Sequence, residues 1–198
     1  EKFGVWKHFS FNVRWNYRDA KRNKFRGLMT VIGVIGCTAL LVCAFGMYDG
    51  MNNLSEWEFN QINHYDSKLI IDDNASQSAI DEVSEEVNGD QLMEGAIEIE
   101  SSSAKKSGSL LVLDGTDLVT PTDYDWDKIE IKDEEVSISQ KMADMLGVGI
   151  GDTVKWHIMG SDKWINTTID KIHADPTSQG FIMSKDKLED LDLNYTPS

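Results

Sequence analysis

GLMTVIGVIGCTALLVCAFGMY, residues 27–48, is a run of 22 residues without one charged side chain. As an α-helix rising 1.5 Å per residue it would be about 33 Å long, enough to cross the hydrocarbon core of a bilayer. Arg26 precedes the run and Asp49 follows it. The core helix of a soluble protein rarely continues for about six turns without a polar face. We therefore expect residues 27–48 to form a transmembrane helix.

A cleaved signal peptide is the alternative to a retained helix. Val34-Ile35-Gly36-Cys37 matches a bacterial lipoprotein cleavage box, but the apolar run continues for eleven residues beyond Cys37. The apolar region of a signal peptide is usually about 7–15 residues long and follows a short basic segment. Here 26 residues precede the run. The lengths therefore favour a retained helix.

Charge divides the chain at this run. Residues 1–26 carry eight Lys and Arg against Glu1 and Asp19, a net charge of +6, while residues from Met51 onward carry eleven Lys and 31 Asp or Glu, a net charge of −20. Basic residues that flank a membrane span remain in the cytoplasm. We therefore expect a cytoplasmic N-terminus, with the residues after about Asp49 outside the plasma membrane.

The acidic part beyond the run is long enough for one domain with its own core. Its charge argues against nucleic acid as a partner, because nucleic-acid binding relies on Lys and Arg to neutralise phosphates. Both cysteines, Cys37 and Cys43, lie in the apolar run, so no disulfide can hold the outer domain. This usage favours a bacterial cell membrane over a eukaryotic secreted domain. Glu1 is not an initiator methionine, and we expect the chain to be part of a longer one.

Residues 1–26 are predicted to form a cytoplasmic amphipathic helix on the membrane surface. Apolar and aromatic residues recur at helical spacing, and basic residues form a neighbouring stripe, so that rings could enter the headgroup region while cations meet anionic lipid. The alternative is a helix that packs on other protein. The expected membrane-surface residues are Trp6, Phe9, Arg14, Arg18, Arg22 and Arg26, and Val13, Tyr17 and Ala20 extend the apolar face.

Small residues follow one narrow face of the predicted span. Gly36, Ala39, Cys43 and Gly46 are spaced three, four and three residues apart. A face of small residues lets a second helix approach closely, and close packing is a main source of association energy in lipid. Glycine is also common in membrane helices in general. We expect this helix-packing face to contact another membrane helix.

Beyond the span, a helical stalk is expected over residues 49–63 and an extracytoplasmic α+β domain over residues 64–198. Short strands that pair mostly by hairpins, with helices interspersed, define the α+β class. The predicted strands cover 68–71, 92–100, 110–113, 154–158, 164–172 and 181–183, and the predicted helices cover 78–88, 138–146 and 184–191.

Apolar residues of these elements make up the expected core. Gly151 is expected to turn the chain with a positive backbone φ before the strand at Val154. Ile80, Val83 and Val87 are expected to face inward from their helix. The rest of the predicted core is Leu69, Ile71, Ile97, Ile99, Leu111, Leu113, Met142, Leu146, Val154, Trp156, Ile158, Ile169 and Ile182.

No pattern in the sequence predicts catalysis, a cofactor or a metal. The four histidines have no partner at metal-ligand spacing, and Gly147–Gly151 follows a helix rather than a strand, the reverse of a dinucleotide site. Asp123, Asp125, Asp127 and Glu134 fit four positions of a calcium loop. Lys128 stands where that loop needs glycine, so a solvated acidic loop is the prediction.

Three stretches resemble the FtsX/MacB-type ABC transporter permeases. RDAKRNKFRGLMTVIG, Arg18 to Gly33, resembles the basic segment that opens their first transmembrane helix. ISQKMADMLGVGIGDTV, Ile138 to Val154, is similar to the strand, short helix and "vGDtv" strand of their extracytoplasmic domain. Phe181 to Ser184 is similar to the strand before that domain's last helix. The stretches occur in family order and are spread over most of the chain, from Arg18 to Ser184.

The resemblance implies a membrane subunit that pairs with a second permease copy or half and binds a cytoplasmic ABC ATPase. In the family the ATPase contact lies mainly between later spans, so no residue of this chain inherits it, and ATP hydrolysis belongs to the partner subunit. The implied function is coupling of ATP hydrolysis to movement of the outer domain during export or extraction of an amphipathic substrate. The alternatives are a non-transporting subunit that controls cell-wall hydrolases or a sensor, and a single-span surface receptor.

Overall fold

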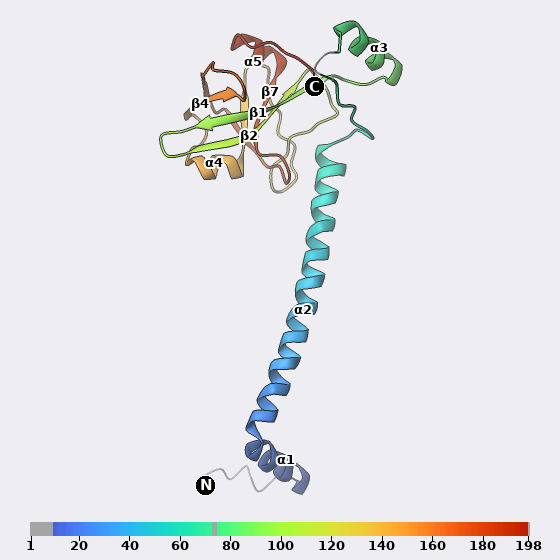
Figure 1. The fold of residues 1–198 in the computed structure, drawn as a ribbon, viewed down its shortest axis with the longest axis vertical. Helices are drawn as coiled ribbons and strands as arrows, with labels where there is room; N and C mark the ends of the chain where they lie inside the picture. Colours follow the sequence, from blue (N-terminus) through green and yellow to red (C-terminus); the bar gives the residue numbers. More distant parts are fainter. Residues whose placement is uncertain (1–9, 73–74, 198) are drawn as a thin grey trace. The chain divides into compact units, whose positions relative to one another are not determined.

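The computed structural model describes residues 10–72 and 75–197, without the side chains of Arg14 and Ala20. It divides into two compact units, Glu1–Asn52 and Asn53–Ser198. Its elements in chain order (Figure 1) are α1 (Phe11–Arg22), α2 (Lys24–Glu56), the π-helix η2 (Trp57–Ile62), α3 (Gln77–Val87), β1 (Leu92–Glu100), β2 (Lys105–Leu113), β3 (Val136–Ser139), α4 (Gln140–Leu146), β4 (Thr153–Ile158), β5 (Ile165–Thr168), β6 (Lys171–His173), β7 (Gly180–Ser184) and α5 (Lys185–Asp190).

The first unit is helical, and its two helices are separated at Asn23. Its backbone N–H donates to the carbonyl of Asp19 at 2.9 Å, and its side-chain amide donates to the Asp19 carboxylate at 3.2 Å. These bonds end α1, and α2 begins at the next residue. The segment predicted as one helix to residue 26 is therefore divided at Asn23.

The second unit is a mixed α+β domain, as predicted. Its seven strands follow the order β5-β4-β1-β2-β7-β3-β6, with β2–β7 and β3–β6 parallel and the other pairs antiparallel. The outermost strands β5 and β6 are joined by only two residues, Ile169 and Asp170. A link this short spans about 10 Å. The sheet therefore curls until its two edges meet at one corner.

The prediction of one strand over 164–172 was wrong, because the chain bends at this corner and forms two strands, β5 and β6. The Asp170 carboxylate accepts the backbone N–H of Val136 at 2.8 Å, and the Asp170 N–H donates to the Val136 carbonyl at 2.9 Å. Both bonds direct the chain away from β4 and toward β3. Because a strand that changes neighbours must bend, β5 ends at Thr168 and β6 begins at Lys171. Ile169 between them is fully buried.

The main hydrophobic core fills the inside of the curled sheet. Alternate residues of each strand enter it, together with one side of α4 and Leu188 of α5. Trp156 lies at its centre, where its indole N–H donates to Thr167 at 2.8 Å and its ring meets Phe181 edge to face. Of the predicted core, Ile97, Ile99, Met142, Leu146, Val154, Trp156 and Ile169 are buried in this cluster, and Ile158 is half-buried against it.

Three other predicted core residues lie on the opposite face of the sheet. Leu111 and Leu113 are half-buried there and pack on a second, smaller cluster, and Ile182 is 5% exposed on the neighbouring strand β7. The prediction that Leu111 and Leu113 enter the main core was therefore wrong, because the sheet has apolar residues on both faces. Leu110 and Val112, the complementary residues of β2, enter the main core.

The segment before β1 was predicted wrongly. Residues 68–71 form no strand, Leu69 is 58% exposed, and Ile71 is half-buried outside both cores. α3 forms where expected, with the Ser76 hydroxyl accepting the N–H of Ala79, but Val83 and Val87 are about half exposed. This short apolar run pairs with neither of the edge strands, β5 and β6.

Two further predictions concern turns and helix ends. Gly151 adopts φ +90°, which confirms the expected positive value. Ser184 caps α5 by accepting the N–H of Lys187 at 3.0 Å, as predicted. The helix predicted over 138–146 begins at Gln140, because Ile138 and Ser139 belong to β3. It ends at Gly147 as expected, with φ +66°.

Candidate functional site

The apolar helix is the first candidate functional element. The helix from Lys24 to Ile62 is 39 residues long, its most apolar window has a mean hydropathy of 2.5, and none of that window is buried. The hydroxyls of Thr30 and Thr38 donate to carbonyls four residues earlier, at 3.0 and 2.9 Å, so these polar groups are satisfied inside the helix. Among the described residues this is the one helix long and apolar enough to cross a membrane.

The four small residues share one side of this helix. At about 100° per residue, Gly36, Ala39, Cys43 and Gly46 fall within an arc of about 80°. All four are exposed, and a Cβ added at Gly36 or Gly46 would meet no atom within 4 Å. Within the described part of the chain nothing packs on this side, which leaves space for another helix.

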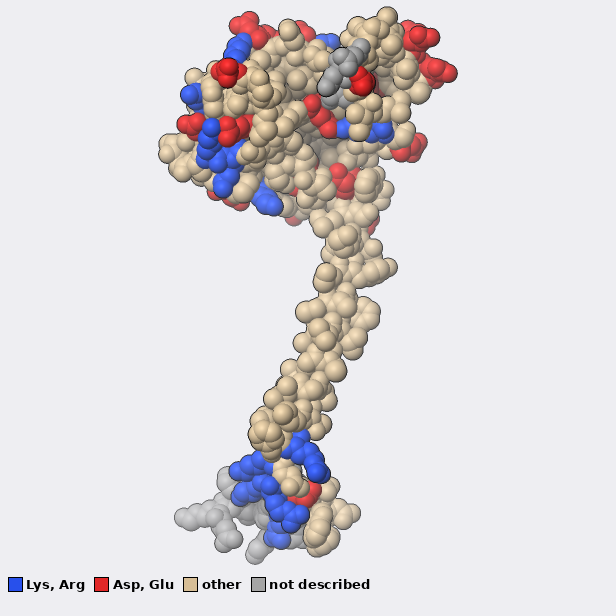
Figure 2. Space-filling model, viewed as in Figure 1, with Lys and Arg blue, Asp and Glu red and all other residues tan. Residues whose placement is uncertain are grey.

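Basic residues gather on α1 and the start of α2 (Figure 2). Arg18, Arg22 and Arg26 are exposed, and Arg22 forms a 3.6 Å ion pair with Asp19. Arg14 lies in α1, but its side chain is not described; Trp6 and Phe9 lie outside the described residues.

Aromatic residues occur on two sides of α1. Val13 and Tyr17 are exposed on the predicted apolar side. Phe11 and Trp15, whose ring centres lie 6.2 Å apart, are on the basic side of the helix. Around the helix axis both lie within about 60° of Arg18. The sequence prediction left this second pair out because it considered only the stripe through Trp6, Phe9 and Val13.

The second candidate site is the junction where the helix enters the α+β domain. Trp57 and Ile62 of η2 are buried against Val119 and Ala174, and this group, the junction cluster, has Tyr65, Leu111, Leu113 and Trp126 around it. The indole N–H of Trp57 donates to the buried Thr122 hydroxyl at 2.8 Å. Backbone bonds from His64 to Leu118 and from Thr120 to Ile62 extend the contact. The end of the helix is therefore built into the domain.

Glu58 adds a polar contact to the junction. Its carboxylate accepts the side-chain amide of Asn63 at 2.8 Å and the hydroxyl of Thr177 at 3.1 Å. Burial raises the pKa of Glu58 and the nearby Asp175 carboxylate raises it further, while the two hydrogen bonds oppose the shift. Glu58 thus connects the helix to the loop before β7.

Sequence reasoning placed Trp57 in the stalk and did not predict the junction. The helical continuation to Ile62 is confirmed, but the change from α- to π-helix at Trp57 has no signal in the sequence. A π-turn shifts the following side chains around the helix axis. This shift lets Trp57 and Ile62 face one cluster although they are five residues apart.

Among the described residues, the buried pair of Ser137 and His173 is the arrangement most similar to a catalytic nucleophile and its base. The Ser137 hydroxyl and His173 Nδ1 are 2.8 Å apart, but the two residues are 0% and 2% exposed. A substrate in solvent cannot reach either atom. The pair fastens β3 to β6, its partner in the sheet.

Acid should destabilise the domain through His173. Burial lowers the pKa of His173 to about 4 from 6.5. Between these values the unfolded chain binds a proton that the folded chain does not, so stability falls as the pH falls through this window. The expected loss at pH 4, relative to pH 7.5, is on the order of 3 kcal/mol. Urea unfolding of the wild type and His173→Gln at both pH values isolates this contribution, and equal acid losses in the two proteins would contradict it.

The acidic loop after Pro121 is held by hydrogen bonds to the carboxylate of Asp123. Asp123 accepts the backbone N–H groups of Asp125 and Asp127, each at 2.9 Å. Over residues 10–72 and 75–197, no three His, Cys, Asp or Glu side chains are grouped so that they could hold a metal ion.

The described residues thus define an α+β domain joined to a helix long and apolar enough to span a membrane. Comparison with models of known protein families, and with curated proteins, finds no match for this sequence.

Proposed function

We propose that this chain is part of a membrane permease subunit of an ABC-type complex. It couples ATP hydrolysis by a cytoplasmic ATPase to movement of its extracytoplasmic domain, for export or extraction of an amphipathic substrate. The observation that carries the proposal is the helix from Lys24 to Ile62, whose last turn is buried in the domain through Trp57 and Ile62. The resemblance of three stretches to FtsX/MacB-type permeases supports it.

The junction cluster supplies the mechanical part of the proposal. A movement of residues 53–56 displaces Trp57, which is held by packing and by its bond to Thr122. The bond between Glu58 and Thr177 transmits the same displacement to the loop before β7. Packed side chains move as units rather than deforming continuously. A tilt or shift of the stalk would therefore carry the domain with it.

The proposed partners follow from the surface of the helical unit. Membrane lipid surrounds residues 27–48, with α1 at the cytoplasmic headgroups of a bacterial plasma membrane. A second permease copy or half packs through transmembrane helices. The ATPase binds parts of the subunit beyond this chain.

Membrane topology can be measured by cysteine labelling in intact cells. Cys37 and Cys43 are first replaced by alanine, and single cysteines are placed at Ser10 or Ser107, both of which are exposed. An impermeant maleimide is expected to label the cysteine at 107 and not the cysteine at 10. After cell lysis both should react, which controls for accessibility. The reverse labelling in intact cells would contradict the orientation.

Gly36→Leu is expected to impair assembly of the full-length subunit. The added side chain would hold a neighbouring helix away from the packing face, where close approach contributes the association energy. Gly33→Leu is the matched control, since Gly33 is also an open glycine of α2 but lies about 60° away from Gly36 around the helix. Crosslinking and size-exclusion chromatography in detergent measure the complex. Equal assembly of both variants and the wild type would show that this face makes no helix contact.

The function itself is tested with the full-length subunit and its ATPase in liposomes. Extraction of a fluorescent lipopeptide from the outer leaflet should require ATP and stop when the ATPase carries an inactivating Walker B substitution. Absence of ATP-dependent extraction, together with ATP-dependent activation of a cell-wall hydrolase, would instead establish the regulatory subunit. Absence of any effect of ATP on the complex would overturn both functions.

A further inference from the structure

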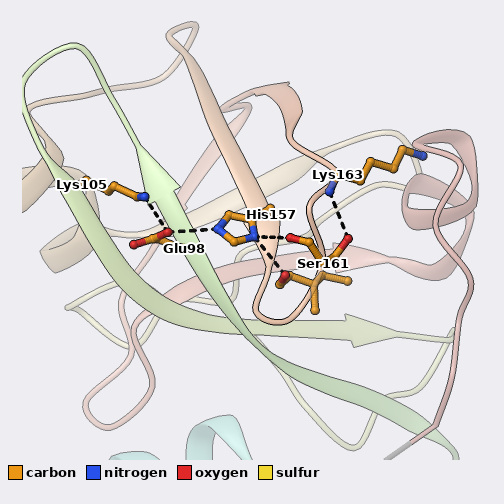
Figure 3. Close-up of polar contacts among 6 residues, drawn as sticks. Glu98, Lys105, His157, Ser161 and Lys163 are labelled. Carbon is orange, nitrogen blue, oxygen red and sulfur yellow. Dashed lines mark hydrogen bonds and ion pairs between the residues drawn. The ribbon is translucent and has the colours of Figure 1, made fainter.

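A hydrogen-bonded histidine joins three neighbouring strands of the sheet, β4, β1 and β2 (Figure 3). His157 of β4 lies opposite Glu98 of β1 in the strand register. Its Nε2 is 3.0 Å from the Glu98 carboxylate, and Lys105 of β2 binds the same carboxylate oxygen at 2.7 Å. The side chain of His157 is 15% exposed, so water reaches only part of the ring.

The other ring nitrogen of His157 also faces only acceptors. Its Nδ1 is 2.8 Å from the carbonyl oxygen of Ser161 and 3.1 Å from that of Ile158. A neutral imidazole carries one N–H and one lone pair, whereas an imidazolium carries two N–H groups. A neutral ring would therefore direct a lone pair at either the carboxylate or the carbonyls. The arrangement is satisfied only when both nitrogens carry protons.

We propose that protonated His157 fastens the loop between β4 and β5 to strand β1, and that loss of its proton releases this loop. The loop, residues 159–164, is a pH-sensitive element of the domain. The inference does not depend on the proposed transport function, because every contact in it lies within the α+β domain.

The charges around His157 favour its protonated form. The hydrogen bond with Glu98 is the main reason that the pKa of His157 is raised above 6.5, partial burial opposes the shift, and the two carbonyls add to it. Bonds from Lys105 and His157 lower the pKa of Glu98. Lys105 and Lys155 oppose the imidazolium by charge, but both ammonium groups lie over the Trp164 ring, at 4.9 and 4.7 Å from its centre.

The remaining neighbours complete this environment. The Trp164 ring lies 4.2 Å from the His157 ring, centre to centre, where an indole favours a cation. Glu100 follows Glu98 on the same face of β1, opposite Lys155. The Lys163 ammonium points away from His157 (Figure 3) and donates to the carbonyls of Leu191 and Asp192, at 3.1 and 2.8 Å.

The direction of the pH response follows from these shifts. The contribution of His157 is complete below pH 6.5 and is lost as the pH rises through its raised value in the folded chain. The contribution of Glu98 is present above pH 4.5 and is lost as the pH falls through its lowered value. Release on the alkaline side frees the Ser161 carbonyl, and through Lys163 it loosens the hold on the segment at Leu191.

The protonation state can be observed directly in the full chain. The ¹⁵N-labelled protein in detergent micelles is titrated, and the ring nitrogens of His157 are followed by NMR. We expect both nitrogens to be protonated at pH 5.5 and the titration midpoint to lie above 6.5. Glu98→Gln should shift this midpoint down, and Glu100→Gln, the same charge change two residues along the strand, should shift it much less. A singly protonated ring at pH 5.5, or equal shifts in both variants, would overturn the proposal.

Hydrogen exchange tests the release of the loop. After correction for intrinsic rates, the backbone amides of residues 159–164 should exchange several-fold faster at pH 8.5 than at pH 5.5, while amides at the centre of β1 and β2 stay equally protected. His157→Gln cannot titrate and should show fast loop exchange at both pH values. Unchanged loop protection in the wild type across this range would overturn the proposal, and that measurement requires no variant.

Discussion

Gly180→Ala is expected to unfold the α+β domain. Gly180 is the first residue of β7 and lies opposite Ser109 in the parallel pair with β2. A Cβ at this position would overlap the carbonyl oxygen of Ser109 and lie 2.6 Å from its nitrogen. Because these are backbone atoms, only separation of the two strands could relieve the overlap. We expect a loss of more than about 4 kcal/mol, the range of severe core disruptions.

Hydrogen exchange at the strand amides of the full chain in detergent measures this loss. Circular dichroism is less suitable, because the helix α2 would remain folded and dominate the signal. Gly95→Ala is the control, because Gly95 lies in the middle of β1 and a Cβ there meets no atom within 4 Å. That variant should keep its protection, with a change below about 1 kcal/mol. Normal protection in Gly180→Ala would show that β2 and β7 are not as close as described.

Trp57→Ala is expected to separate the helix from the domain and to destabilise the domain by about 3–5 kcal/mol. The indole is 8% exposed, lies 5.9 Å from the Tyr124 ring between centres, and donates to Thr122. Its removal leaves a cavity in the junction cluster and a buried hydroxyl that has lost a donor. If the chain works in the proposed permease complex, ATP hydrolysis should continue in this variant while substrate extraction falls, because the stalk no longer carries the domain.

Phe59→Ala is the matched control for this variant. Phe59 lies two residues further along the same π-helix but is 67% exposed. Its truncation should change the stability of the domain by less than about 0.5 kcal/mol. Denaturant unfolding, followed by exchange at β1 and β2, measures both variants. Similar losses in the two would mean that Trp57 does not anchor the helix.

The junction also determines where the α+β domain begins. A fragment starting at residue 64 lacks Trp57 and Ile62, two of the four buried residues of the junction cluster. The compact unit instead starts at Asn53.

Several elements could be predicted because their signals are local. The apolar run of α2 is helical at every residue, since a helix satisfies its backbone groups within itself. The spacing of Ile97 and Ile99 predicted the buried side of β1, and the predicted helix ranges gave the end of α4 at Leu146 and the start of α5 next to Ser184. Each of these depends on residues only a few positions apart.

Long-range pairing decided the elements that were missed. Leu69–Ile71 has the composition of a strand, yet it pairs with no strand of the sheet. Residues 164–172 have the pattern of one strand, yet they form β5 and β6, which are the two edge strands. Strand register assigns every side chain to a face, and it is set by partners distant in the sequence. Leu111 and Leu113 therefore have the predicted alternation but belong to the cluster on the other face.

The sequence by itself determined the apolar helix, its basic flank, the acidic domain and the α+β class, because composition and periodicity act within one element. Only the tertiary structure decided that Trp57 is an anchor, that Gly180 must lack a side chain, and that His157 meets Glu98 from 59 residues away. These properties arise from contacts between segments, and the energy of a contact depends on which two surfaces the curled sheet brings together.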